Sequence, residues 1–177
     1  QVRASSQLLF SLDVTASHNI NDTQWIGNFR DTVTSATHYA FARLNQQTIA
    51  TALRATYIAT PQLSVQLYAQ PFVSNGSYAD ARELSATPRA TAYTDRYLAY
   101  SAPASALSGY RDREFKSNTV VRWEYRPGST LYLVWTQGRQ LYNDSPDTRN
   151  WSQSYPDLLS IRPDNTFLVK LSYWLNR

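Results

Sequence analysis

The residues of this chain that could carry out chemistry are few and widely spaced. Its only histidines, His18 and His38, lie far apart in the sequence. A metal site built on them would need carboxylate support, for which Asp13, Asp22 and Asp31 are the candidates. Exposed histidines in a loop are the simpler interpretation, and we therefore predict no metal site.

Catalytic arrangements are equally scarce. The chain has no cysteine, so thiolate metal sites, cysteine nucleophiles and disulfides are excluded. It contains no Gly-x-Ser-x-Gly elbow and no glycine-rich phosphate loop. The spacing of its carboxylates does not favour glycoside hydrolysis. We predict a protein that is not an enzyme and that binds no cofactor. The carboxylates considered are Asp80, Glu83, Asp112, Glu114 and Glu124.

The elements that position these residues are strands, because apolar and polar side chains alternate along most of the chain. The pattern predicts an all-β fold: an antiparallel up-and-down meander of about six long strands, in a single domain over residues 1–177. Residues 78–84, before Pro88, are the one helical candidate. The predicted strands are 7–16, with pairing that could continue through 23–26; 38–60, broken near 45–47; 63–73; 113–125; 130–138; and 167–177.

Charged side chains alternate with the apolar ones in all of these strands except the fifth. In the fifth strand, Arg139 shares its side with Trp135 but lies at the strand end. A charge facing lipid at mid-membrane costs about 2–4 kcal/mol, and a polar lumen removes that cost. Arg122 and Glu124 form either a constriction that selects solutes or, as we favour, an interior ion pair that joins Lys116 and its neighbours across strands. The predicted lumen charges are Arg54, Lys116, Arg122, Glu124 and Lys170.

Aromatic residues fall into two groups. The first lies on the predicted strands, on their apolar sides except for Trp174, and would form interfacial girdles in a membrane barrel, or the core of a soluble fold. The second lies in the predicted loops, where stacking on sugars is the functional reading and loop packing is the simpler one. The interfacial candidates are Trp123, Tyr125, Trp135, Tyr173 and Trp174; the loop aromatics include Trp25, Tyr78, Tyr93, Tyr97, Tyr100, Tyr110, Trp151 and Tyr155.

The connections between strands alternate in length. Residues 60–62 are a short connection, and Arg126-Pro-Gly-Ser129 predicts a type II turn, because Pro presets φ and Gly accepts positive φ. Residues 17–37, 74–112 and 140–165 are long connections. Tight turns at one end and long loops at the other are typical of outer-membrane barrels. A soluble β-sandwich shows the same strand pattern but has less reason for this arrangement.

Composition agrees with a β-rich protein. Aromatic residues make up 14% of the chain, and charged residues make up 17%, below the value of about 25% usual for soluble domains. No apolar run approaches about 18 residues, which excludes a transmembrane helix. The net charge of +4 comes from scattered basic residues without a recognisable module, so we predict no nucleic-acid partner.

Three segments carry a family resemblance: residues 60–72, 117–135 and 164–177, with Arg122-Trp-Glu-Tyr-Arg-Pro-Gly-Ser-Thr-Leu131 as the most specific string. They resemble the C-terminal β-barrel region of a bacterial outer-membrane family of unknown function. Long members of that family carry an N-terminal carbohydrate-binding-module-like domain, which has no counterpart here. The resemblance implies localisation in the Gram-negative outer membrane, contact with its lipid, and a role in envelope structure or solute passage.

About six strands are too few for a membrane barrel, since the smallest single-chain barrels have about eight. We therefore expect upstream barrel strands or other copies of the chain to pair at the sheet edges. The start at Gln1, without Met or a signal peptide, predicts a processed product or the C-terminal part of a longer barrel protein. Two alternatives remain: an extracellular β-rich subunit that assembles through sheet edges, and a carbohydrate-binding surface protein that recognises glycans.

Overall fold

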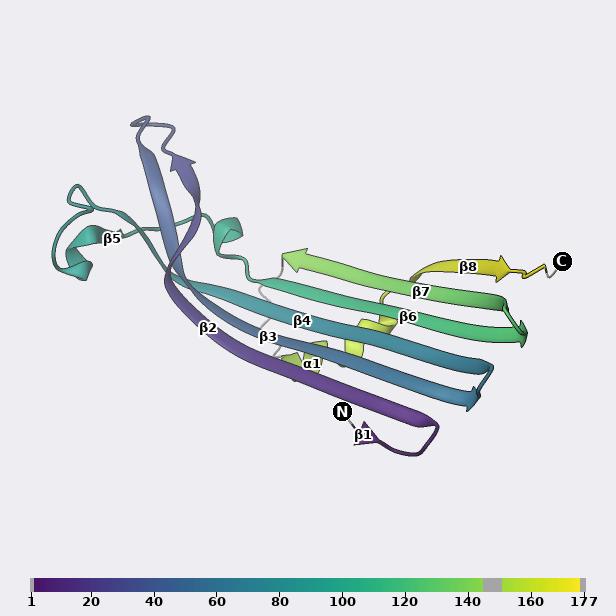
Figure 1. Cartoon of the computed structure of the whole chain (residues 1–177). Helices are drawn as coiled ribbons and strands as arrows, with labels where there is room; N and C mark the ends of the chain where they lie inside the picture. The colour runs from purple at the N-terminus through teal and green to yellow at the C-terminus, as the bar shows by residue number, and fades with distance from the viewer. Residues whose placement is uncertain (1, 145–150, 176–177) are drawn as a thin grey trace.

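A single antiparallel sheet contains most of the chain (Figure 1). The computed structural model describes residues 2–144 and 151–175. The strand order is β1-β2-β3-β4-β6-β7-β8, with β5 paired to β4, so the predicted all-β meander is confirmed and the sheet is open. The strands are β1 (Val2–Arg3), β2 (Leu8–Arg30), β3 (Thr37–Thr60), β4 (Leu63–Leu84), β5 (Tyr97–Ala99), β6 (Tyr110–Arg126), β7 (Ser129–Asp144) and β8 (Asp164–Ser172).

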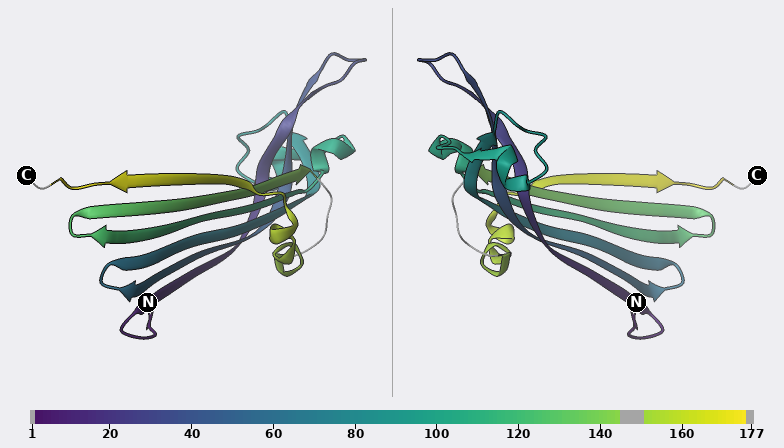
Figure 2. Two further views of the ribbon diagram at one scale, coloured as in Figure 1. Left: turned by 90° about the vertical axis from the view of Figure 1, so that its right-hand side faces the viewer. Right: turned by 90° about the vertical axis from the view of Figure 1, so that its left-hand side faces the viewer.

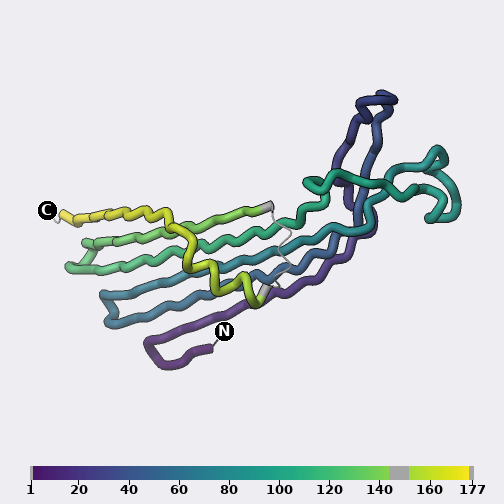
Figure 3. The backbone as a smooth tube through the Cα atoms, turned by 180° about the vertical axis from the view of Figure 1, so that it is seen from behind, coloured from purple at the N-terminus to yellow at the C-terminus, as the bar shows by residue number. Residues whose placement is uncertain are grey.

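In the described part of the chain, helical structure is limited to four short pieces, η1 (Tyr93–Arg96), η2 (Ala104–Leu107), α1 (Trp151–Ser154) and η3 (Pro156–Ser160). The views in Figure 2 show α1 and η3 beside one face of the sheet, and Figure 3 shows them crossing that face. Within the described residues, no helix is long and apolar enough to span a membrane.

Tight turns lie at one end of the sheet and long connections at the other (Figure 1). β3 ends at Thr60 and β4 begins at Leu63. The turn between β6 and β7 has Gly128 at φ 76°, as the predicted type II turn requires. The predicted tight turns are therefore present, and residues 85–109 form a long connection as predicted, whereas only residues 31–36 connect β2 to β3.

The strands continue much further than the sequence pattern predicts. β2 extends to Arg30, so most of the predicted loop over 17–37 is strand, and β3 has no break at 45–47. Those polar residues pair with β2 on one side and β4 on the other, as in His18 opposite Gln47 and Gln47 opposite Asn75. In these polar segments, backbone pairing keeps the chain extended although the side chains neither alternate nor become buried.

The helical prediction for residues 78–84 is wrong. This segment is the end of β4, where Tyr78 pairs with Leu44 and Arg82 pairs with both Phe41 and Ala99. Pairing on both sides satisfies the backbone and overrides the helix propensity of the Ala and Glu residues. The last strand ends at Ser172 rather than continuing to the C-terminus, and residues 145–150 and 176–177 lie outside the described part of the chain.

Little of the chain is buried. The buried hydrophobic side chains among the described residues include Ala40, Ala42, Ile49, Val73 and Leu158. A compact monomer of 20.2 kDa exposes about 8,800 Å². This chain exposes 12014 Å², because a single-layer sheet leaves both faces largely uncovered. The isolated chain therefore lacks the core of a compact soluble domain of its size.

Candidate functional site

One face of the sheet carries a continuous apolar band next to the tight turns. Residues paired directly across antiparallel strands point to the same face, so the register defines the members of the band. In the strands where the band is longest, it extends over about 9–11 residues, which is the length that a tilted strand needs to cross a bilayer. The band consists of alternate residues, starting with the first, in 8–16 of β2, 49–57 of β3, 63–73 of β4, 115–123 of β6, 131–135 of β7 and 167–171 of β8.

The apolar band contains no charged residue and is widely exposed. Val14 is 60% exposed and Val169 is 69% exposed. A hollow of about 280 Å³ on its surface is lined by apolar side chains alone, those of Leu63, Val121, Trp123, Leu131 and Leu133. Exposed apolar surface of this extent marks a face that meets lipid or another protein.

The opposite face, here called the polar face, carries the charges. Every predicted lumen charge lies on it, and three ion pairs form there. Arg54 contacts Asp13 at 3.3 Å, and Arg122 contacts Glu124 at 3.1 Å, which agrees with the favoured ion-pair interpretation. Lys116 contacts Glu114 at 2.6 Å, so it does not join the Arg122 pair. Lys170 lies opposite Tyr132, which in turn lies opposite Arg122.

The predicted interfacial aromatics lie at the margins of the apolar band. Trp123 and Tyr125 contact each other edge to face near the tight turn, with ring centroids 6.1 Å apart. Nearby, Arg126 donates a hydrogen bond to the Tyr173 hydroxyl at 3.2 Å, and Trp174 lies over Gly128. Amphipathic rings at this level are typical of the boundary between lipid and water.

Trp135 lies at the other margin of the band, where β7 and β8 become polar. It stacks on Phe167 at 6.0 Å, and its indole Nε1 donates to Asn165 Oδ1 at 2.9 Å. One side of the Trp135 ring therefore contacts the apolar band, and its indole N–H contacts the polar residues beyond the band. The five interfacial candidates consequently form two groups, one at each margin.

Above the apolar band, α1 and η3 cover a polar cluster that the sequence reasoning missed. Arg113 is 4% exposed, and its guanidinium contacts Asp157 at 3.4 Å and Asn143 at 3.1 Å. Arg111 lies 4.0 Å from the same Asp157 carboxylate. Arg111, Arg113 and Phe115 are alternate residues of one strand and therefore lie on the same face. This spacing in the sequence indicates that the apolar face becomes polar at Arg113.

The two histidines lie apart and each has an ordinary partner. His18 lies 2.7 Å from Asn45 Oδ1. His38 contacts the Glu83 carboxylate and stacks on Tyr100 with ring centroids 5.0 Å apart. No cluster of three or more potential metal ligands occurs among residues 2–144 and 151–175.

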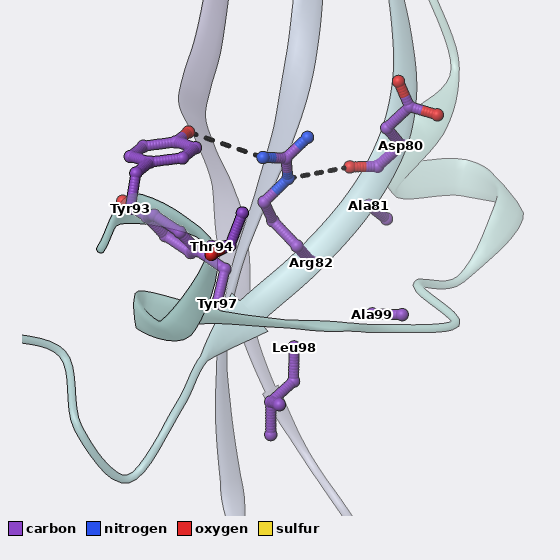
Figure 4. A pocket seen from close by; sticks show the side chains of 8 residues that line it. All are labelled: Asp80, Ala81, Arg82, Tyr93, Thr94, Tyr97, Leu98 and Ala99. Carbon is purple, nitrogen blue, oxygen red and sulfur yellow. Dashed lines mark hydrogen bonds between the residues drawn. The ribbon is translucent and has the colours of Figure 1, made fainter. Parts of the chain in front are cut away.

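A second feature that the sequence did not reveal lies among the long connections. The end of β4, η1 and β5 enclose an open hollow of about 380 Å³, in which Arg82 lies between Asp80 and Tyr93 (Figure 4). Its position depends on a backbone conformation at Asp80 that alternation patterns do not show.

The sheet has two edges with little or no pairing. β1 covers β2 only opposite Leu9 and Phe10, and β8 is the last strand at the other edge in the described part of the chain. Successive long strands alternate in direction, so β2 and β8 run opposite ways. Both edges therefore offer backbone groups for further strands.

Comparison with known proteins identifies one family. A domain family of unknown function, described as Domain of unknown function (DUF5916), matches residues 1–176. No curated protein and no solved structure matches the chain. The expectation of a family of unknown function is confirmed, and the links to the outer membrane and to a carbohydrate-binding-like domain stay predictions.

Proposed function

We propose that this chain, which belongs to that family of unknown function, is a non-enzymatic wall segment of a Gram-negative outer-membrane β-barrel that serves envelope structure or solute passage. The observation that supports this proposal most is the apolar band, which crosses all six long strands without a charge. Outer-membrane barrels present such a band to lipid and a polar face to the lumen.

The two edges extend the proposal to partners. Open edges are not tolerated in lipid, because unpaired backbone groups find no water there. Since β2 and β8 run in opposite directions, an antiparallel barrel closes with an even number of further strands. Strands from a longer chain or from another copy of this one meet that requirement. The competing function, an extracellular subunit assembled through the same edges, predicts edge pairing without lipid.

Detergent dependence tests the membrane assignment. We expect the purified chain to require detergent or lipid to stay dispersed, and to float with phospholipid vesicles in a density gradient. A chain that stays monomeric in plain buffer contradicts the proposal. Regular polymers formed without lipid support the extracellular subunit instead.

Cysteine cross-linking tests the edge partners, because the chain has no cysteine of its own. Thr15→Cys on β2 and Thr166→Cys on β8 place thiols on the two edge strands. A disulfide-linked dimer formed by mixing the two single variants indicates that copies pair edge to edge. Its absence in a lipid-inserted sample indicates strands from a longer chain.

A further inference from the structure

The hollow of about 380 Å³ among the long connections has the features of a binding site. Its volume lies in the range of about 300–1,000 Å³ typical of small-ligand sites. It is formed where β4 ends, with η1 and β5 as the other walls (Figure 4). None of the predicted lumen charges or interfacial aromatics lines it, so it is distinct from the sites predicted from the sequence.

Arg82 occupies the middle of the hollow and keeps hydrogen-bonding capacity for a ligand. Its guanidinium donates to the Tyr93 hydroxyl and to the Asp80 carbonyl oxygen, each at 3.4 Å. These distances are at the long end for hydrogen bonds, and a guanidinium has five N–H donors. The group also lies 5.9 Å from the Tyr97 ring centroid, which fixes its orientation.

Asp80 has a strained backbone that points to a role for its side chain. Its φ is 53°, and it lies in a bulge where two residues of β4 oppose one residue of β3, between the pairs Phe41–Arg82 and Arg43–Ala79. Glycine is the residue that adopts such a conformation without steric cost. Strain retained at a side-chain-bearing residue is a recognised mark of functional positions.

The walls of the hollow are held in place before any ligand arrives. The Ser85 amide donates to the Arg96 carbonyl at 2.9 Å, and Arg96 Nε donates to the Ala90 carbonyl at 2.7 Å. Tyr97 contacts Phe41 edge to face, with centroids 5.7 Å apart, and lies 5.3 Å from Tyr93. Such support lowers the ordering cost of binding.

The chemistry of these groups selects the class of ligand. A small anion in the hollow would meet the Asp80 carboxylate, and a small cation would meet Arg82. Neighbouring hydroxyl groups satisfy both, because each hydroxyl donates as well as accepts. Tyr93 is 43% exposed and offers a flat apolar ring to the C–H face of a pyranose. We propose that this hollow binds a neutral sugar unit of a glycan.

Titration calorimetry on the full chain, in a detergent without a sugar headgroup, tests the proposal. The probes are hexasaccharides of α-1,4-glucose, β-1,4-glucose, β-1,3-glucose, mannose and xylose, with inorganic phosphate as the anionic probe. We expect at least one oligosaccharide to bind and phosphate not to bind. Tyr93→Ala should weaken that binding by about tenfold, as truncation of an aromatic anchor does.

Two further variants separate binding from folding. Asp80→Gly should abolish sugar binding while leaving the melting temperature unchanged or higher, because glycine relieves the positive φ. Tyr39→Ala removes an exposed tyrosine that does not line the hollow, and should bind as the wild type does. The proposal is overturned if no oligosaccharide binds, if phosphate binds instead, or if Tyr93→Ala and Asp80→Gly bind normally. Because the walls are local, failure of the vesicle-flotation test leaves this result unaffected.

Discussion

Each long strand passes through two regions that differ in what their side chains meet. In the lower region, between the tight turns and the upper margin of the apolar band, apolar and polar side chains mostly alternate. In the upper region, towards the long connections, the same strands carry polar residues on both faces, with His18 and Gln47 on one face and Asn19 and Gln46 on the other. Backbone pairing is continuous through both. The alternation of apolar and polar side chains therefore depends on what surrounds a strand, whereas backbone pairing with its neighbours is what makes it a strand.

The largest expected effect on stability comes from placing a charge on the apolar face of the lower region, compared with the same charge on the polar face. Val121 belongs to the apolar band and its neighbour Val120 points to the polar face. In lipid vesicles, Val121→Arg should lower the free energy of unfolding by about 2–4 kcal/mol, the cost of an arginine facing lipid at mid-membrane. Denaturant titration of vesicle-inserted protein measures it.

Val120→Arg is the matched control, and it should change that free energy by no more than about 0.5 kcal/mol. Equal losses in the two variants would show that the faces do not differ in environment.

Removal of a carboxylate tests the upper region. Asp157→Ala removes the carboxylate that contacts the buried guanidinium of Arg113, at a cost of about 1–3 kcal/mol. We expect α1 and η3 to detach from the sheet while the apolar band keeps its pairing. Hydrogen exchange should rise in residues 154–160 and stay constant in 115–123.

Leu159→Ala removes an exposed side chain from the same segment and should leave exchange unchanged. Faster exchange throughout the lower region in Asp157→Ala would mean that the two regions are not independent.

Two glycines give a smaller contrast. Gly128 has φ 76°, and an added Cβ would lie 3.2 Å from the Trp174 Cβ, so Gly128→Ala should cost about 1–2 kcal/mol. Gly138 has open space around its Cβ position, and Gly138→Ala should change stability by less than about 0.5 kcal/mol. Thermal unfolding of both variants measures the difference, and equal melting temperatures would contradict it.

The smallest expected effect concerns the loop at the tip of the upper region. The Asp31 carboxylate accepts hydrogen bonds from the Val33 amide at 2.7 Å and the Thr34 amide at 3.1 Å, which lower its pKa. Because the folded pKa is lowered, this stabilisation is present above the usual aspartate pKa of about 3.9 and is lost as pH falls through the folded value.

Carbon-13 titration of the Asp31 carboxyl should therefore give a midpoint below the usual value. A midpoint at or above it would contradict the assignment, and Asp31→Asn should remove the pH dependence of the loop amide shifts.

Sequence reasoning predicted the lower region well because strands with one apolar face and one polar face leave a periodic pattern in the sequence. The alternation around Val121 and Trp123, the side on which Arg54 and Lys170 lie, and the turn at Gly128 all agree with the structure. The upper region left no such pattern. Most of residues 17–30 read as loop because neither face is consistently apolar, and residues 78–84 read as helix because of their Ala and Glu residues. Pairing with neighbouring strands makes both segments extended.

The candidate sites divide in the same way. The lumen and interface candidates were predicted from the alternation of odd and even positions along single strands. The Arg111–Arg113–Asp157 cluster and the hollow at Arg82 bring together residues from distant segments, and the hollow also needs the positive φ of Asp80. The local order of side chains along the sequence predicts neither a contact between distant segments nor a single backbone angle.

The length of the β2–β3 hairpin has a consequence for access. From Ala16 at the upper limit of the apolar band to Arg30, β2 adds about 45 Å of strand, at about 3.3 Å per residue. Figure 1 shows this hairpin projecting away from the other strands. If the chain forms the proposed outer-membrane barrel, residues 31–36 lie at the tip of this hairpin, where an approaching antibody, protease or neighbouring cell surface would meet them. In that arrangement, an epitope tag inserted there should be readable on intact cells.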